Sequence, residues 1–147
     1  MSKSNRKTEN SVPSVHNHKY DIFVVDDNFD QANIMKLLIE QTGLKAKFTT
    51  KSEIAYQTIL KDKPRLVILD LMMPEIDGLK LLKKIKDNPL TQEVKIIIYS
   101  GKLYDSDRRK AFMLGADIFL TKPTRSHILL DSIMSLLQIE QHEILQN

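Results

Sequence analysis

The feature of this 147-residue sequence that most restricts its fold is a series of short apolar runs. Four of them are strand-length, rich in branched or aromatic residues and followed by polar residues: 22–25, 66–69, 96–99 and 118–120. Such runs are typical of strands buried on both faces. A weaker fifth candidate, residues 45–49, alternates polar and apolar side chains and suits a half-exposed edge strand.

Segments with the apolar spacing of helices follow each of these runs. Their expected ends are marked, in chain order, by Gly43, Pro64, Pro89, Gly115 and residue 137, and Asp77 is a candidate N-cap for the third helix. A strict alternation of strand and helix, repeated five times, predicts a parallel sheet covered by helices on both faces. The sequence therefore predicts an α/β fold of the doubly wound (βα)5 type in a single domain.

Composition and charge exclude several classes of function. The net charge of +3 is concentrated in residues 1–19, which carry four basic residues and one acidic residue, and the remainder has 18 of each. We therefore expect no direct binding of nucleic acid. The sequence has no cysteine, which excludes disulfides and thiolate chemistry. No apolar run approaches the roughly 18 residues that span a bilayer, so we expect no membrane insertion and a cytoplasmic location.

Chemically active side chains follow the predicted strands, where ligands gather in sheets of this kind. Asp26 and Asp27 follow the first run, Asp70 follows residues 66–69, Ser100 follows 96–99, and Lys122 closely follows the last run. Three crowded carboxylates repel one another and need more compensation than one lysine provides. An all-oxygen site of this kind suits Mg²⁺, or Mn²⁺ in its place.

The same set of groups suits phosphoryl transfer. Asp70 could act as the nucleophile and form an acyl phosphate, while Lys122 and the cation neutralise charge and Ser100 donates a hydrogen bond. Taken singly, each residue is ordinary turn or loop chemistry. Their joint appearance, each at the end of a different buried run, favours the functional interpretation.

Together these residues resemble the receiver domain of two-component response regulators. The resemblance rests on four segments, residues 24–28, 67–78, 98–101 and 115–123, and covers residues 20–137. It implies a flavodoxin-like sheet with strand order 2-1-3-4-5. The receiver domain would lie between a flexible basic tail, residues 1–19, and a helical or frayed extension, residues 138–147.

The resemblance also implies roles for individual residues. A histidine kinase or a histidine phosphotransfer protein would phosphorylate Asp70. Asp27, Asp70 and the backbone carbonyl of Met72 would hold the metal ion, with Asp26 acting mainly through water. Lys122 would pair with the phosphoryl group.

Switching would involve Ser100, which would move to hydrogen-bond the phosphoryl group, and Phe119, at the aromatic position that turns inward. Pro123 would follow a cis peptide bond. The face built from the fourth helix, fifth strand and fifth helix would then change its contacts with an unidentified downstream protein. Met72 and Lys102 occupy the positions that govern attack of water on the acyl phosphate, and the apolar Met72 predicts slow self-dephosphorylation.

The resulting hypothesis is a phosphorylated switch that assists its own phosphorylation and dephosphorylation, not an enzyme acting on metabolites. A hydrolase with an aspartate nucleophile is disfavoured, because such enzymes place a second aspartate where this chain has Met72. Four glycines cannot build a nucleotide-binding glycine motif. Two alternatives stay open: a receiver-like interaction module that takes no phosphate, and a receiver fragment of a longer regulator or hybrid kinase.

Overall fold

The computed structural model describes residues 18–74, 77–101 and 104–138. Its centre is a parallel five-stranded sheet with the order β2-β1-β3-β4-β5. The predicted fold class and strand order are therefore confirmed. In chain order the strands are β1 (Ile22–Val25), β2 (Ala46–Thr49), β3 (Leu66–Leu69), β4 (Lys95–Ser100) and β5 (Ile118–Thr121).

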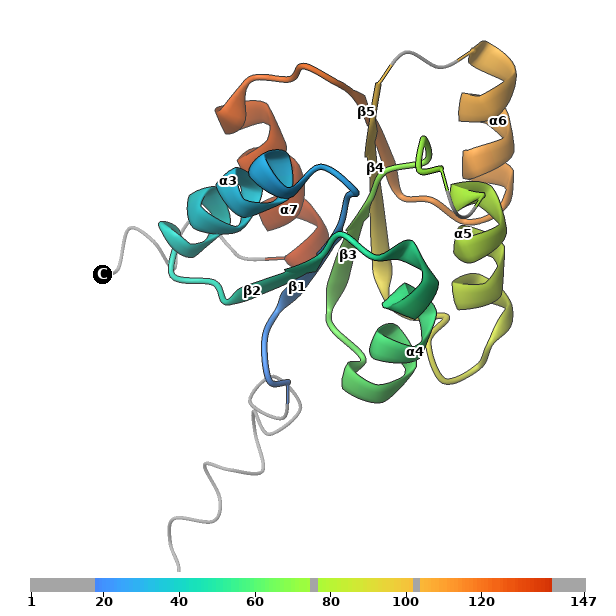
Figure 1. Cartoon of the computed structure of the whole chain (residues 1–147), viewed down its shortest axis with the longest axis horizontal. Helices are drawn as coiled ribbons and strands as arrows, with labels where there is room; N and C mark the ends of the chain where they lie inside the picture. The colour runs from blue at the N-terminus through green and yellow to red at the C-terminus, as the bar shows by residue number, and fades with distance from the viewer. Residues whose placement is uncertain (1–17, 75–76, 102–103, 139–147) are drawn as a thin grey trace, which may run out of the picture.

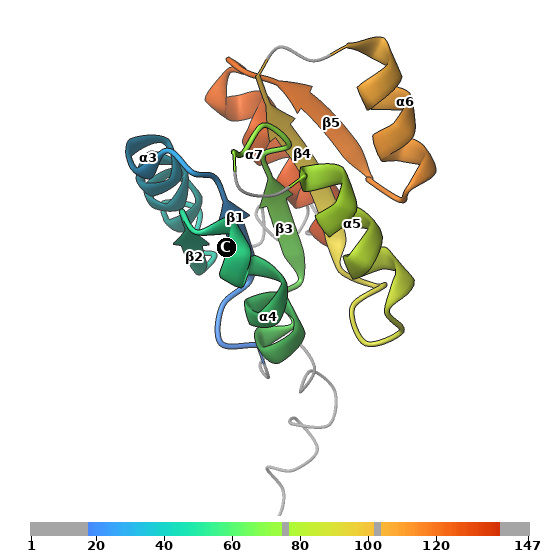
Figure 2. The same ribbon diagram turned by 45° about the vertical axis from the view of Figure 1, so that its right-hand side comes forward.

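The helices form a layer on each face of the sheet (Figures 1 and 2). On one face lie α3 and α7, and on the other lie α4, α5 and α6. Their bounds are α3 (Phe29–Glu40), α4 (Ser52–Asp62), α5 (Gly78–Asp87), α6 (Asp105–Met113) and α7 (Ser126–Leu137). Within the described ranges, no helix combines the length and apolar character that crossing a bilayer requires.

Two of the helices begin with side-chain caps that are relevant to the site. The Asn28 side chain accepts a hydrogen bond from the backbone N–H of Gln31 at 3.0 Å and starts α3. Asp77 accepts from the N–H of Leu79 at 2.9 Å and starts α5, as the sequence predicts. These bonds satisfy N–H groups that otherwise lack partners at a helix start. Both helices consequently begin at defined points near the carboxyl edge of the sheet.

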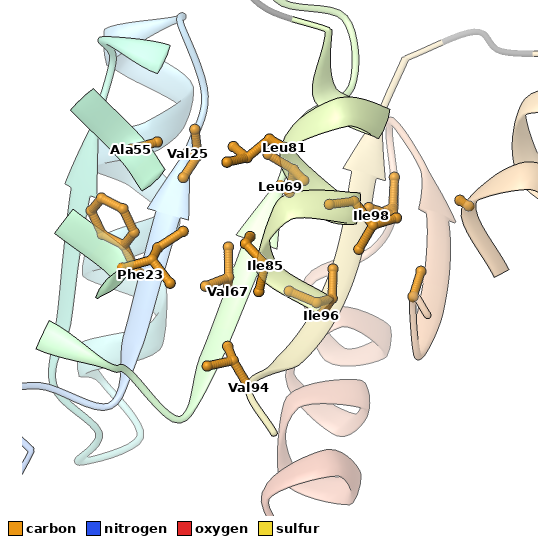
Figure 3. Close-up of a cluster of buried hydrophobic side chains, with 14 of the residues drawn as sticks. Phe23, Val25, Ala55, Val67, Leu69, Leu81, Ile85, Val94, Ile96 and Ile98 are labelled. Atoms are coloured by element: carbon orange, nitrogen blue, oxygen red, sulfur yellow. The ribbon is translucent and has the colours of Figure 1, made fainter. Parts of the chain in front are cut away.

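Buried apolar side chains hold each helical layer on the sheet. Figure 3 shows the cluster on the α5 side, where Leu81 and Ile85 lie over Val67, Leu69 and the neighbouring strand residues. A second cluster joins α3 and α7 to the opposite face. Because β1 and β3 are buried along their whole length, the centre of the sheet is a rigid base for the loops that follow it.

Strand register aligns the carboxyl ends of the central strands. Val25 pairs with Leu69, and Leu69 pairs with Ile98. The residues that follow β1 and β3 therefore emerge side by side. One expectation differs in detail: β5 is only partly buried, because it ends the sheet and has a strand on one side alone.

The predicted outer segments fall largely outside the described residues. Of the basic tail, residues 1–19, the structure describes 18 and 19, and of the extension, residues 138–147, it describes 138. Their boundaries stay predictions.

Candidate functional site

The carboxyl edge of the sheet brings together the side chains that the sequence places after its strands. Asp26 follows β1, Asp70 follows β3, Ser100 ends β4 and Lys122 follows β5. Asp26 and Asp70 are nearly buried, and Ser100 is fully buried. Residues far apart in the sequence thus meet in one polar cluster at the carboxyl edge of the sheet.

Asp70 is held by hydrogen bonds to both of its carboxylate oxygens. Its Oδ1 accepts from the Ser100 hydroxyl at 2.5 Å and from the backbone N–H of Met72 at 2.8 Å. Its Oδ2 accepts from the Lys122 ammonium at 3.2 Å. Asp70 as a residue is 7% exposed, so its carboxylate is held in one orientation in a site that is not fully closed.

Lys122 is shared among several acceptors. Its Nζ lies 2.7 Å from Asp26 Oδ2, 2.7 Å from Gln31 Oε1 and 3.2 Å from Asp70 Oδ2. Burial by itself would lower the pKa of Lys122, but the hydrogen bond to Asp26 and the charges of Asp70 and Asp26 outweigh it and raise the pKa. The ammonium therefore stays charged and partly compensates the carboxylates.

Asp26, Asp27 and Asp70 form a group of carboxylates that suits a hard cation. One oxygen from each lies within 4.8 Å of the others. Two oxygens on opposite sides of a single Mg²⁺ would be about 4.2 Å apart, so small adjustments would let all three reach one ion. With one lysine against three carboxylates, the cluster keeps negative charge, and its all-oxygen donors fit Mg²⁺ or Mn²⁺.

A comparison with known families shows which family the chain belongs to. The model of the response regulator receiver domain matches residues 22–134. The chain belongs to this family. Receiver domains, as a family, are phosphoacceptor switches.

Individual relatives show how widely the receiver domain is used. The chain is 32% identical to the 3′,5′-cyclic-nucleotide phosphodiesterase regA of Dictyostelium discoideum over 82% of its length, which is 16% of that protein. It is 28% identical to an uncharacterized 14.6 kDa protein of Leptolyngbya boryana, covering 70% of this chain and 79% of that one. The uncharacterized transcriptional regulatory protein YclJ of Bacillus subtilis is 31% identical over 69% of this chain and 44% of that protein. The chain thus spans less than half of the length of some of these relatives.

A solved structure supports the same assignment. The signal receiver domain of a DNA-binding response regulator from Colwellia psychrerythraea superposes with a TM-score of 0.76 at 27% identity. The superposition covers 82% of this chain and 99% of that one. The described body of this chain therefore corresponds to a whole receiver domain.

Gly78 allows the receiver's α5 to begin directly against the segment that follows Asp70. A Cβ on Gly78 would lie 2.7 Å from Leu71 Cα and 3.1 Å from the Asp70 carbonyl oxygen. Both neighbours are backbone atoms that cannot move aside independently. A side chain here would displace the residues next to the Asp70 carboxylate.

The other predicted positions of the receiver domain lie as follows. The peptide bond between Lys122 and Pro123 is cis. Phe119 is buried, with the ring of Phe112 at 6.3 Å and the Arg108 guanidinium 4.7 Å from its own ring. Met72, two residues after Asp70, is 54% exposed. The metal role of the Met72 carbonyl stays a prediction, and Lys102 lies outside the described residues.

Sequence reasoning missed Gln31. It is an exposed glutamine on the first turn of α3, a common residue in a common place, and it follows no predicted strand. Only the contact with Lys122, 91 positions further along the chain, distinguishes it from other surface glutamines.

Proposed function

We propose that this receiver domain accepts a phosphoryl group on Asp70 from a phosphohistidine of a histidine kinase or a histidine phosphotransfer protein. The observation that carries the proposal is the environment of the Asp70 carboxylate. It is oriented by Ser100 and the Met72 N–H, faces the Lys122 ammonium, and lies beside Asp26 and Asp27. A nucleophile, a cation, a hydroxyl donor and candidate metal ligands are thus in one place.

In the transfer, a carboxylate oxygen of Asp70 forms a bond to phosphorus while the phosphorus–nitrogen bond of the phosphohistidine breaks. The electron pair of that bond stays on the imidazole nitrogen, which leaves as neutral imidazole when the other ring nitrogen carries a proton. Lys122 compensates charge on the phosphoryl oxygens, and Ser100 offers its O–H to one of them. A divalent ion on Asp26, Asp27 and Asp70 would supply further charge neutralisation at those oxygens.

We infer that the phosphoryl group acts on the contacts of Ser100. Its hydroxyl donates to Asp70 and accepts from the N–H of Leu71, so a new acceptor on Asp70 changes the balance of a fully buried group. Ser100 pairs with Thr121 on β5, two residues after Phe119. The face formed by α6, β5 and α7 is therefore the surface we expect to switch its binding to a downstream protein.

The surroundings of Asp70 offer the partner a contact surface. Phe29, 60% exposed, starts α3 next to the Asn28 cap, and Met72 is similarly exposed. Phosphoryl transfer requires the histidine to approach Asp70, and we propose that the donor protein then also contacts these two exposed side chains. We expect Phe29→Ala to slow transfer from a phosphohistidine protein and to leave labelling by acetyl phosphate unchanged. Equal slowing with both donors would remove Phe29 from the docking surface.

The central experiment is incubation of the chain with acetyl phosphate and Mg²⁺ followed by intact mass measurement. We expect the mass of one phosphoryl group on the native chain and on Asp131→Asn, an exposed carboxylate of α7, and none on Asp70→Asn. An unlabelled native chain would favour the phosphate-independent interaction module. Repeated turnover of a phosphate ester would favour the hydrolase. We also propose a cytoplasmic location for this receiver, either as a separate protein or as part of a longer regulator.

A further inference from the structure

The three N–H donors of the Lys122 ammonium are divided unequally among its acceptors. Two contacts of 2.7 Å go to Asp26 and Gln31, and the contact to Asp70 is longer, at 3.2 Å. An ammonium has three donors and no acceptor, so these contacts use all of its capacity. With Asp70 unmodified, Lys122 therefore lies closer to Asp26 and to Gln31 of α3 than to the proposed phosphoacceptor.

Hydrogen bonds join Lys122 and the start of α3 in a closed ring. Lys122 donates to Asp26 Oδ2, and Asp26 Oδ1 accepts from the N–H of Asn28 at 2.9 Å. The Asn28 side chain accepts from the backbone N–H of Gln31, and the Gln31 side-chain oxygen Oε1 accepts from Lys122. Gln31 is thus fixed at its backbone by the helix cap and at its side chain by the lysine. The ring ties α3 to the loop that follows β5.

Gln31 is suited to a reversible hydrogen bond with Lys122. Its amide oxygen is neutral, so it accepts from the ammonium without adding to the negative charge of the three carboxylates. A cavity of about 250 Å³ between α3 and α7 is lined by Gln31 and Lys122, together with Tyr99, whose ring lies 5.4 Å from the ammonium. The side chains of Gln31 and Lys122 can therefore change position without disturbing the packed core.

We propose that Gln31 is a positioning residue for Lys122. Its amide oxygen holds the ammonium toward Asp26 while Asp70 is unmodified and releases it when a phosphoryl group forms on Asp70. The inference rests on the proposed function of Asp70. An acyl phosphate carries more negative charge than the carboxylate it replaces, which strengthens the attraction on Lys122 and makes the neutral amide the weakest competitor. Phosphorylation would then open the ring at Gln31 and loosen the connection between α3 and the β5–α7 loop.

The test compares initial rates of labelling by acetyl phosphate and Mg²⁺ in matched variants. Gln31→Met has a similar length and replaces the amide oxygen with a thioether sulfur, a much weaker acceptor, so Lys122 gives up little on moving to the phosphoryl group. We expect labelling roughly two- to fivefold faster than in the native chain, a modest change because the bond is at the surface. Gln31→Glu adds a charged acceptor that holds Lys122 more strongly, and we expect slower labelling. Gln41→Met, the same change at the residue that directly follows α3, should match the native rate.

Further outcomes separate this inference from its alternatives. In a Lys122→Met background, Gln31→Met should have no effect on the rate, because the residue it acts through is gone. A persisting effect there, or the same direction of change in Gln31→Met and Gln31→Glu, would show a packing role and overturn the inference. If the native chain itself takes no label, the proposed function of Asp70 fails. If the native chain is labelled and Gln31→Met is labelled at the same rate, only the proposed role of Gln31 fails.

Discussion

The Ser100 hydroxyl lies 2.5 Å from Oδ1 of Asp70 and donates a hydrogen bond to it, while its own oxygen accepts from the backbone N–H of Leu71 at 3.2 Å. One fully buried hydroxyl thus connects the end of β4 with the two residues that follow β3. A buried group with both bonds made is costly to remove and sensitive to a change in either partner.

Ser100→Ala should therefore lower stability and weaken switching. The N–H of Leu71 loses its acceptor, and we expect the free energy of unfolding, measured with urea, to fall by about 1–3 kcal/mol. Asp70 keeps Lys122 and the Met72 N–H, so labelling by acetyl phosphate should persist. Amide chemical shifts of α6, β5 and α7 should change less on phosphorylation than in the native chain. Full-size shift changes in Ser100→Ala would refute a role for this hydroxyl in switching.

Met72→Asn should shorten the lifetime of the phosphorylated form. The exposed methionine offers no hydrogen bond to a water near the acyl phosphate, whereas an asparagine amide can position one. We expect dephosphorylation to be about three- to tenfold faster, followed by intact mass after removal of the donor. The control is Met113→Asn on α6, which is more exposed and belongs to another part of the surface. Equal lifetimes in the native chain and Met72→Asn would contradict the prediction.

Asp27→Asn should weaken binding of the divalent ion. Asp27 is the exposed member of the carboxylate group, so its loss removes one charged oxygen ligand with little effect on packing. We expect at least about tenfold lower affinity for Mn²⁺, measured by its electron paramagnetic resonance signal, with Mg²⁺ as competitor. Asp30→Asn, an exposed acidic residue on the first turn of α3, serves as the control. Unchanged affinity in Asp27→Asn would exclude this residue as a ligand.

Gly78→Ala and Gly43→Ala should separate stability from function. At Gly78 the new methyl group would press on Leu71 and the Asp70 carbonyl, and we expect about 1–3 kcal/mol of destabilisation together with slower labelling of Asp70. At Gly43 no atom lies within 4 Å of the added Cβ, but φ is +95°, so the cost is backbone strain of about 1 kcal/mol. Gly43→Ala should label at the native rate. Similar labelling rates in both variants would show that Gly78 serves stability only.

Asp62 should contribute to stability in a pH-dependent way. Tyr20 donates to it at 2.7 Å, and Lys19 and Lys47 lie 3.7 Å from its carboxylate. Burial alone would raise the pKa of Asp62, but the Tyr20 hydrogen bond and the lysines outweigh it and lower the pKa below its ordinary 3.8. A lowered pKa in the folded state gives stability that is present above pH 3.8 and is lost as the pH falls through the folded value.

We therefore expect the free energy of unfolding to fall less between neutral pH and about pH 3 in Asp62→Asn than in the native chain. Urea unfolding at several pH values measures this slope. Asp87→Asn, an exposed residue of a surface ion pair, is the control and should keep the native slope. The same slope in Asp62→Asn would mean that the carboxylate has no net interaction in the folded state.

The sequence by itself determined the strands, the alternation with helices and the residues at the strand ends. A parallel sheet places the carboxyl ends of all its strands on one edge. Recognising the strands was therefore enough to predict that the side chains after them lie near one another, namely Asp26, Asp70, Ser100 and Lys122. This inference needs only periodicity and topology, which are local or general properties.

Only the tertiary structure decided which atoms meet. The division of Lys122 between Asp26, Gln31 and Asp70 depends on how α3 and the β5–α7 loop are placed across the sheet edge. The close approach of Gly78 to Leu71 likewise depends on where α5 packs. Differences of about half an ångström select one acceptor over another, and such differences result from the packing of the whole domain, which no local pattern in the sequence records.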